Sequence, residues 1–268
     1  MPNKLISSKY EEPTSLTERY LSNNPFPHIV LDDFLSEDLM ESVAAEFPDL
    51  SSLPDSKEYA NQKEIKFSSI GSPRLSPSAK QLINYLNSDV FLEYLQNLTG
   101  IKETLISDPY LSGGGYHEIK TGGVLKVHAD FNKHPKLDLD RRLNLLLYLN
   151  KDWDAKWCGN LELYDQDNLD SPVVSIEPIF NRCVIFTTTD FTYHGHPEKL
   201  TCPSDTSRRS IALYYFSTGR PSHEISGKKH TTLFIETKGE KFKADFKGLI
   251  RDFIPPIIIK AVKRTLGR

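Results

Sequence analysis

The chain has 268 residues, of which 38% are hydrophobic and 26% charged, and its formal net charge is −3. This composition allows one or two domains with a buried core. It argues against a disordered chain and against binding of nucleic acid through a global basic surface. Three cysteines without a C-x-x-C pair exclude a disulfide framework and favour reduced thiols in the cytoplasm. We also expect no signal peptide and no membrane span, because no apolar run approaches about 18 residues.

The first part of the chain has helical patterns. Residues 1–25 are polar and are predicted to form a flexible tail, whereas residues 26–105 are predicted to be a mostly helical flank. After a short extended segment, Ser36 begins a helix in which apolar residues recur every four positions from Leu39 to Phe47. These patterns predict helices that pack against the rest of one domain.

A second helix is predicted over residues 78–99, where leucines and aromatic residues recur with helical spacing. Gly100 is expected to end it, because glycine readily adopts the left-handed conformation found after many helices. The intervening residues 50–77 are rich in serine, proline, lysine and asparagine and are predicted to form a long surface loop.

Short strand-like segments separated by turns follow from residue 106 to residue 220. Many short strands with this spacing indicate an antiparallel sandwich or barrel, and we expect the helices to pack outside it. Residues 26–220 should therefore form a single domain with its β core at 106–220. The segments are 116–119, 124–130, 143–150, 160–164, 173–179, 183–188 and 210–217.

The C-terminal extension, residues 221–268, ends in an amphipathic basic helix that Pro255 and Pro256 interrupt. Its lysines and arginines alternate with isoleucines and other apolar residues. Such a helix can lie on an anionic membrane or on a protein partner. The alternative is a helix that docks on the body of the protein.

Candidate metal ligands lie on and near one predicted strand. Because residues i and i+2 of a strand share a face, the side chains of His128 and Asp130 should lie together. His194, several strands later, is a candidate third ligand. Two histidines and one carboxylate leave open positions on an octahedral ion and suit non-haem Fe(II). The pattern alone is unspecific, and His128 as an ordinary strand histidine remains the alternative.

A candidate anion site involves the last predicted strand. A buried Arg208 would need an anionic partner, and a carboxylate held by both arms of the guanidinium is the natural one. The hydroxyl of Tyr148 could donate to the same carboxylate. Asn144 shares a face with Tyr148 and is expected to contact the same small molecule or to make a structural hydrogen bond. Arg209 could exchange roles with Arg208.

These residues resemble the Fe(II)- and 2-oxoglutarate-dependent dioxygenases of the prolyl-4-hydroxylase-like group. The stretch YLNKDWDAKWCGNLELY, residues 148–164, is similar to a prolyl-hydroxylase segment, except that Asn160 replaces its second glycine. The resemblance implies a double-stranded β-helix, a jelly roll of the cupin type. It also implies Fe(II) as the metal, held by His128, Asp130 and His194. His196 is a rival for the last position, and the spacer to Arg208 is longer than usual.

The same resemblance implies that Arg208 and Tyr148 bind the 5-carboxylate of 2-oxoglutarate, with Asn144 also at the cosubstrate. Dioxygen would be consumed, a C–H bond of a prolyl or other side chain in a peptide or protein hydroxylated, and succinate and CO2 released, with ascorbate as a further reductant. Candidate substrate-rim residues are Tyr116, Phe131 and Tyr214. The alternatives are a hydroxylase of a small metabolite, such as a free amino acid or a sugar-linked compound, and a non-catalytic jelly-roll module with a structural zinc.

Overall fold

The computed structural model describes residues 5–54, 56–71, 75–224, 229–237 and 241–242. The chain divides into two units, Met1–Lys238 and Gly239–Arg268, and the β core lies entirely within the first. The expected C-terminal basic helix lies outside the described residues. Within the described part, no helix combines the length and apolar character needed to cross a membrane.

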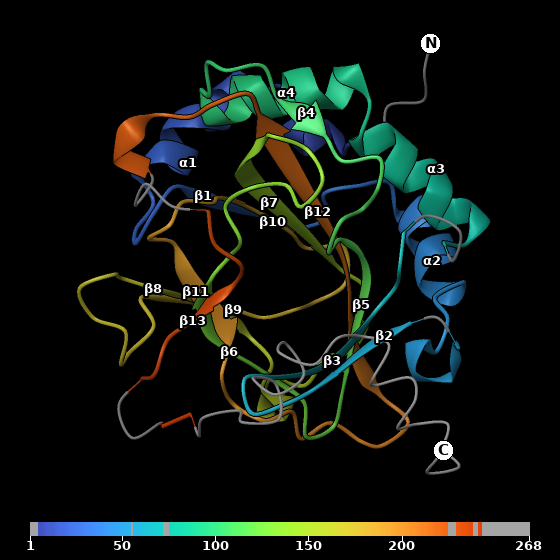
Figure 1. Cartoon of the computed structure of the whole chain (residues 1–268). Coiled ribbons are helices and arrows are strands. Elements are labelled where there is room, and N and C mark those ends of the chain that lie inside the picture. Colours follow the sequence, from blue (N-terminus) through green and yellow to red (C-terminus); the bar gives the residue numbers. More distant parts are fainter. Residues whose placement is uncertain (1–4, 55, 72–74, 225–228, 238–240, 243–268) are drawn as a thin grey trace, which may run out of the picture. The chain divides into compact units, whose positions relative to one another are not determined.

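The β core is a jelly roll, as the sequence predicts. Its strands follow the order β1-β10-β7-β12-β5-β3-β6-β11-β8-β9, with three short strands at the sides, and neighbouring strands run antiparallel (Figure 1). The strands are β1 (His28–Leu31), β2 (Lys57–Ala60), β3 (Glu64–Ser68), β4 (Ile106–Ser107), β5 (Gly115–Lys120), β6 (Val124–Ala129), β7 (Asp140–Tyr148), β8 (Leu161–Tyr164), β9 (Val174–Ile176), β10 (Cys183–Thr187), β11 (Tyr193–His196), β12 (Ser207–Ser217) and β13 (Leu233–Phe234).

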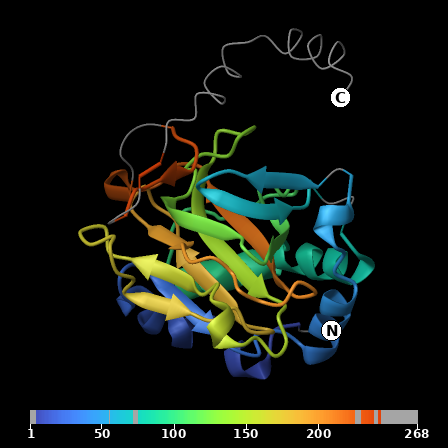
Figure 2. The ribbon, with the colours of Figure 1, turned by 90° about the horizontal axis from the view of Figure 1, so that it is seen from below.

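Helices cover one side of the sheet, along β1, β10, β7 and β12 (Figures 1 and 2). The α-helices of the described residues are α1 (Thr17–Ser22), α2 (Glu37–Ala45), α3 (Pro77–Leu86) and α4 (Asp89–Thr99). Their apolar stripes bury leucine, valine and phenylalanine side chains against the outward faces of these strands. Burial of this area is the main stabilising contribution of the flank.

Strand alternation separates this helix-covered face from the interior of the jelly roll. On β7, Leu145 and Leu147 belong to the helix-side core, whereas Tyr148 belongs to a second apolar cluster inside the roll. On β12, Leu213 and Tyr215 also face the helices. The residues between them therefore point inward, and this alternation places the candidate site.

The prediction of a flexible N-terminal tail is wrong for residues 5–25. Leu5 and Ile6 are buried, and Ile6 pairs with Leu35 in a β-bridge. Tyr20 of α1 is only 1% exposed, and its hydroxyl is hydrogen-bonded to that of Thr187 in β10. A few apolar residues in a polar segment thus suffice to order it, because they complete a core built by other elements.

Two further differences concern residues 50–99. The expected surface loop contains the β2–β3 hairpin, which pairs with β5 and β6. The strand pattern is weak in this hairpin, because both of its faces carry lysine or glutamate. The expected helix over 78–99 is two helices, α3 and α4, separated at Asn87 and Ser88, and Gly100 ends the second with a φ of 72°.

Candidate active site

His128, Asp130 and His194 meet inside the jelly roll. His128 on β6 is directly opposite His194 on the antiparallel neighbour β11, and Asp130 follows β6 by one residue. The Nε2 atom of His128 lies 3.7 Å from Oδ1 of Asp130, and that of His194 lies 3.4 Å from Oδ2. One potential ligand atom from each side chain lies within 4.8 Å of the others, and all three residues are buried. Among the described residues, this is the cluster with metal-ligand geometry.

Both histidines are arranged to present Nε2 as an electron-pair donor. Nδ1 of His128 lies 2.8 Å from the carbonyl oxygen of Lys126, and Nδ1 of His194 lies 3.4 Å from that of Thr192. A proton on Nδ1 satisfies these carbonyls and leaves Nε2 unprotonated. Burial, followed by the neighbouring His194 imidazole, lowers the pKa of His128 to about 3. Burial also lowers the pKa of His194, so both rings are neutral near pH 7, as metal ligation requires.

The carboxylate of Asp130 is held by two partners. Nη2 of Arg141 donates to Oδ2 at 3.1 Å, and Nδ2 of Asn144 donates to the same oxygen at 2.7 Å. Burial alone would raise the pKa of Asp130, but the Arg141 guanidinium and the two histidines together lower it below its usual range. Asp130 is therefore an anion in a fixed orientation.

Arg141 is the functional candidate that sequence reasoning missed. Strict alternation from Asn144 would point Arg141 toward the helices, but the pairing with β12 steps from Leu143 to Arg141 between Tyr215 and Phe216. Arg142 is thus an extra residue in a β-bulge, which turns the Arg141 side chain inward. The sequence Arg-Arg-x-Asn places two arginines close to Asn144, but residue spacing alone does not reveal where a β-bulge lies.

A second charged position lies on β12. Arg208 is 6% exposed, and its Nε donates to the carbonyl oxygen of Gly159 at 2.7 Å. Its Nη2 lies 3.2 Å from the hydroxyl of Tyr148, which is also buried. Gly159 permits this approach, because a Cβ there would lie 2.5 Å from Leu200 and 3.1 Å from Cδ of Arg208. Within the described part of the chain, no carboxylate lies against this guanidinium.

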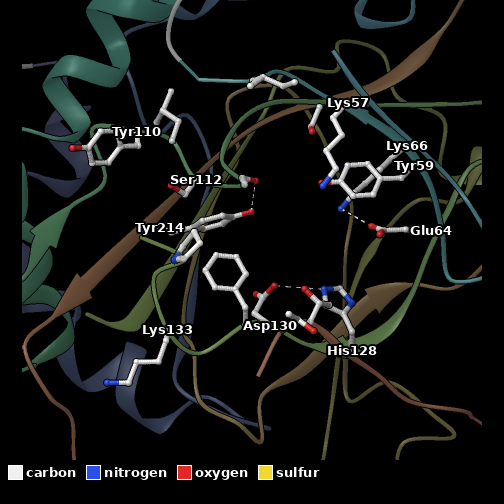
Figure 3. A pocket seen from close by; sticks show the side chains of 18 of the residues that line it. Lys57, Tyr59, Glu64, Lys66, Tyr110, Ser112, His128, Asp130, Lys133 and Tyr214 are labelled. Carbon is white, nitrogen blue, oxygen red and sulfur yellow. Dashed lines mark hydrogen bonds and ion pairs between the residues drawn. The ribbon is translucent and has the colours of Figure 1, made fainter. Parts of the chain in front are cut away.

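An open cavity of about 690 Å³ leads to the histidine–aspartate cluster. Figure 3 shows His128 and Asp130 at one end of it, with Tyr59 and Lys66 on one wall and Tyr214 on the opposite wall. Phe131 also lines it. A pocket of this size over a buried ligand cluster is the usual form of an enzyme's substrate site.

Comparison with known proteins agrees with this geometry. Residues 114–216 match the sequence model of the 2OG-Fe(II) oxygenase superfamily. This segment contains the H-x-D pair, His194 and Arg208. The β core of this chain is therefore similar to that superfamily over residues 114–216.

One curated relative is the mouse (Mus musculus) protein named prolyl 3-hydroxylase OGFOD1, which is 29% identical over 201 residues. The match covers 73% of this chain but only 34% of the mouse protein, so the chain spans about a third of that relative's length. The activity and substrates of the whole relative therefore do not transfer directly.

Two solved prolyl hydroxylases share the fold of this chain. A prolyl-4-hydroxylase from Pseudomonas putida superposes with a TM-score of 0.54 at 14% identity, covering 76% of this chain and 98% of that one. A Trichoplax adhaerens prolyl hydroxylase, in complex with a hypoxia inducible factor oxygen degradation domain peptide fragment, gives 0.57 at 20% identity, covering 78% and 91%. The double-stranded β-helix is therefore common to all three chains.

The likeness to this superfamily implies Fe(II) and 2-oxoglutarate, and the residues of the β core fit both. The cluster offers two imidazole nitrogens and one carboxylate oxygen within 4.8 Å of one another, which is the donor set of a two-histidine, one-carboxylate iron site. A buried guanidinium without an anion is costly, and Arg208 therefore needs a carboxylate such as the distal one of 2-oxoglutarate. Asn144, which donates to Asp130, and Tyr148, which contacts Arg208, lie four residues apart on the same face of β7, so the two sites adjoin.

The predicted substrate-rim residues lie on both faces of the sheet. Phe131 and Tyr214 line the cavity, and the Arg141 guanidinium packs against both rings, its carbon 4.2 Å from the centre of the Phe131 ring and 3.5 Å from that of Tyr214. The prediction for Tyr116 is wrong. Tyr116 is fully buried on the helix side, where it packs on Phe47 at 4.5 Å between ring centres. Its partner across the sheet is Ile211 of the helix-side core, so its neighbour on the chain, His117, occupies the interior face.

Two other expectations are refined. Asn144 contacts Asp130 rather than Arg208 or Tyr148, which corresponds to the structural hydrogen bond considered as its alternative. The rival histidine, His196, is separated from His194 by a register shift and pairs with Leu125. It does not belong to the cluster of ligand atoms formed by the described residues.

Proposed function

We propose that this chain is an Fe(II)- and 2-oxoglutarate-dependent hydroxylase of a prolyl or other side chain in a peptide or protein. The observation that carries the proposal is a buried His128–Asp130–His194 cluster at the base of an open cavity, next to a buried Arg208 that has no carboxylate partner among the described residues. A structural metal site would be closed and would need neither the cavity nor the arginine.

In this proposal, the residues of the site have different roles according to what they contact. His128, Asp130 and His194 would hold the iron, and Arg208 with Tyr148 would grip the distal carboxylate of the cosubstrate. Together, Fe(II) and 2-oxoglutarate activate dioxygen and couple the release of succinate and CO2 to hydroxylation of a C–H bond. Phe131 and Tyr214 would exclude water beside the substrate and hold it over the metal.

The likeness to a prolyl 3-hydroxylase supports a prolyl side chain as the first candidate substrate. Ascorbate, as the reductant that maintains Fe(II), belongs to the same proposal. A cytoplasmic location also remains a proposal, supported by three cysteines without disulfide partners.

The test is turnover of proline-containing peptides with Fe(II), 2-oxoglutarate and ascorbate. We expect succinate and a peptide that gains one oxygen atom. Under anaerobic conditions, Fe(II) with 2-oxoglutarate should give a visible charge-transfer band that His128→Ala abolishes. His223→Ala, at an exposed histidine, is the matched control and should retain the band. A wild-type protein that binds the metal but forms neither band nor succinate would instead be a binding module.

A further inference from the structure

The walls of the cavity are basic, although the chain as a whole carries a net charge of −3. Among the described residues, five lysines but only two carboxylates, Glu64 and the metal-site Asp130, line it. The five lysines are Lys57, Lys66, Lys133, Lys136 and Lys229.

One wall is the inward face of the β2–β3 hairpin. Lys57 and Tyr59 alternate along β2, and Tyr59 pairs across the hairpin with Lys66. Lys66 is neutralised by Glu64 at 3.1 Å. Lys57 instead lies over the Tyr59 ring, with Nζ 4.2 Å from its centre, and has no carboxylate within 4 Å among the described residues. Figure 3 shows these four side chains together on this wall.

The opposite wall repeats the arrangement. Nζ of Lys136 lies 4.8 Å from the centre of the Tyr110 ring, and the described residues offer it no carboxylate partner either. Lys133 on the same side is paired with Asp138 and Asp140. In the described part of the chain, each of these walls thus presents an uncompensated lysine on a tyrosine, and both lysines line the cavity that contains His128.

Resting on the proposed function, we propose that the cavity selects a peptide with acidic residues on both sides of the residue that is hydroxylated. A bound segment runs out past both walls, so an acidic side chain on each side can meet Lys57 or Lys136. An excess of positive charge along the cavity walls also attracts such an acidic segment. The tyrosines beneath hold the lysine stems in place, and their rings supply apolar contact for the peptide.

The test compares three peptides of equal length with one central proline, flanked on both sides by glutamate, glutamine or lysine. Their binding is measured by fluorescence anisotropy on the full chain with Mn(II) and N-oxalylglycine, so that no turnover is needed. We expect the glutamate peptide to bind about tenfold tighter than the lysine peptide at low salt, with glutamine between them. Raising the ionic strength should shrink the difference.

Reversing the charge of the two lysines should reverse the order of the peptide affinities. The double variant Lys57→Glu, Lys136→Glu should favour the lysine peptide, whereas Lys80→Glu, Lys102→Glu, at exposed lysines outside the cavity, should leave the order unchanged. Should the double variant fail to fold, Lys57→Gln, Lys136→Gln should abolish the preference. Equal affinities for all three peptides, or tighter binding of the lysine peptide, overturns the proposal. Replacing the central proline by alanine and measuring hydroxylation separately tests the proposed residue class, so the two failures are distinguishable.

Discussion

Arg141 donates from Nη2 to Oδ2 of Asp130 at 3.1 Å, and the arginine is only 1% exposed. The same guanidinium packs against two aromatic rings of the cavity wall. It therefore connects the orientation of a candidate metal ligand to the surface that a substrate would touch.

Replacing this arginine should weaken the metal site. We expect Arg141→Gln to lower Mn(II) affinity about 10- to 100-fold, because Asp130 loses its cationic partner and becomes free to turn. Titration followed by electron paramagnetic resonance measures this directly. The control is Arg182→Gln, at a surface arginine paired with Asp32, which should leave the affinity unchanged. A folded Arg141→Gln protein with wild-type affinity would show that the contact does not position the ligand.

The two neighbouring arginines of β12 should differ sharply in their effect on 2-oxoglutarate. Arg208→Gln removes a buried cation from the carboxylate site, and we expect a loss of affinity of roughly 100-fold. Tyr148→Phe removes one hydroxyl and should cost up to about tenfold. Arg209→Gln is the matched control, because that side chain faces Glu118 and Phe47 on the helix side. Calorimetric titration with Mn(II) present checks all three, and equal effects at positions 208 and 209 would contradict the assignment.

Tyr116 should behave as a core residue. Its hydroxyl is hydrogen-bonded to that of Ser76 at 2.9 Å, at the start of α3. We expect Tyr116→Phe to lower the free energy of unfolding by about 0.5–1.5 kcal/mol in denaturant titrations. Affinity for 2-oxoglutarate and for peptides should not change. A loss of peptide affinity without a loss of stability would instead indicate that Tyr116 contacts the substrate.

The metal-free protein should become less stable as the pH falls below about 6.5. Burial, with the charge of Lys66, lowers the pKa of His117 to about 3, whereas an unfolded histidine titrates near 6.5. Between these values the unfolded chain binds the extra proton, so each such histidine contributes a loss of up to about 1.4 kcal/mol per pH unit. Unfolding at pH 7, 6 and 5 measures the slope, and His117→Gln should reduce it. A slope equal to that of the wild type would mean that His117 is not buried in its neutral form.

Much of the β core and of the candidate metal cluster followed from local patterns. Alternation in V-L-K-V-H-A-D is sufficient to place His128 and Asp130 on one side of a strand, and the structure has them there. Arg208 and Tyr148 follow from the same period of two, and their side chains meet at 3.2 Å. A strand's side-chain directions depend on its own backbone, so they can be predicted without knowing its neighbours.

The missed residues all depend on relations between strands. Tyr116 faces the helices because β5 pairs with β12 in a register that joins it to Ile211, and a shift of one residue would reverse this. Arg141 turns inward because of a bulge opposite Tyr215 and Phe216. The β2–β3 hairpin exists as part of a sheet whose edges β5 and β6 supply its partners.

The residue order alone was enough to indicate a β-rich oxygenase fold, the three candidate ligands and the arginine–tyrosine pair. The tertiary structure alone decides which side chains surround these residues. Register and bulges arise from pairing between distant segments, and the charge of the cavity arises from lysines on separate loops and strands. Such arrangements minimise the free energy of the whole packed sheet, and no single segment contains the information that specifies them.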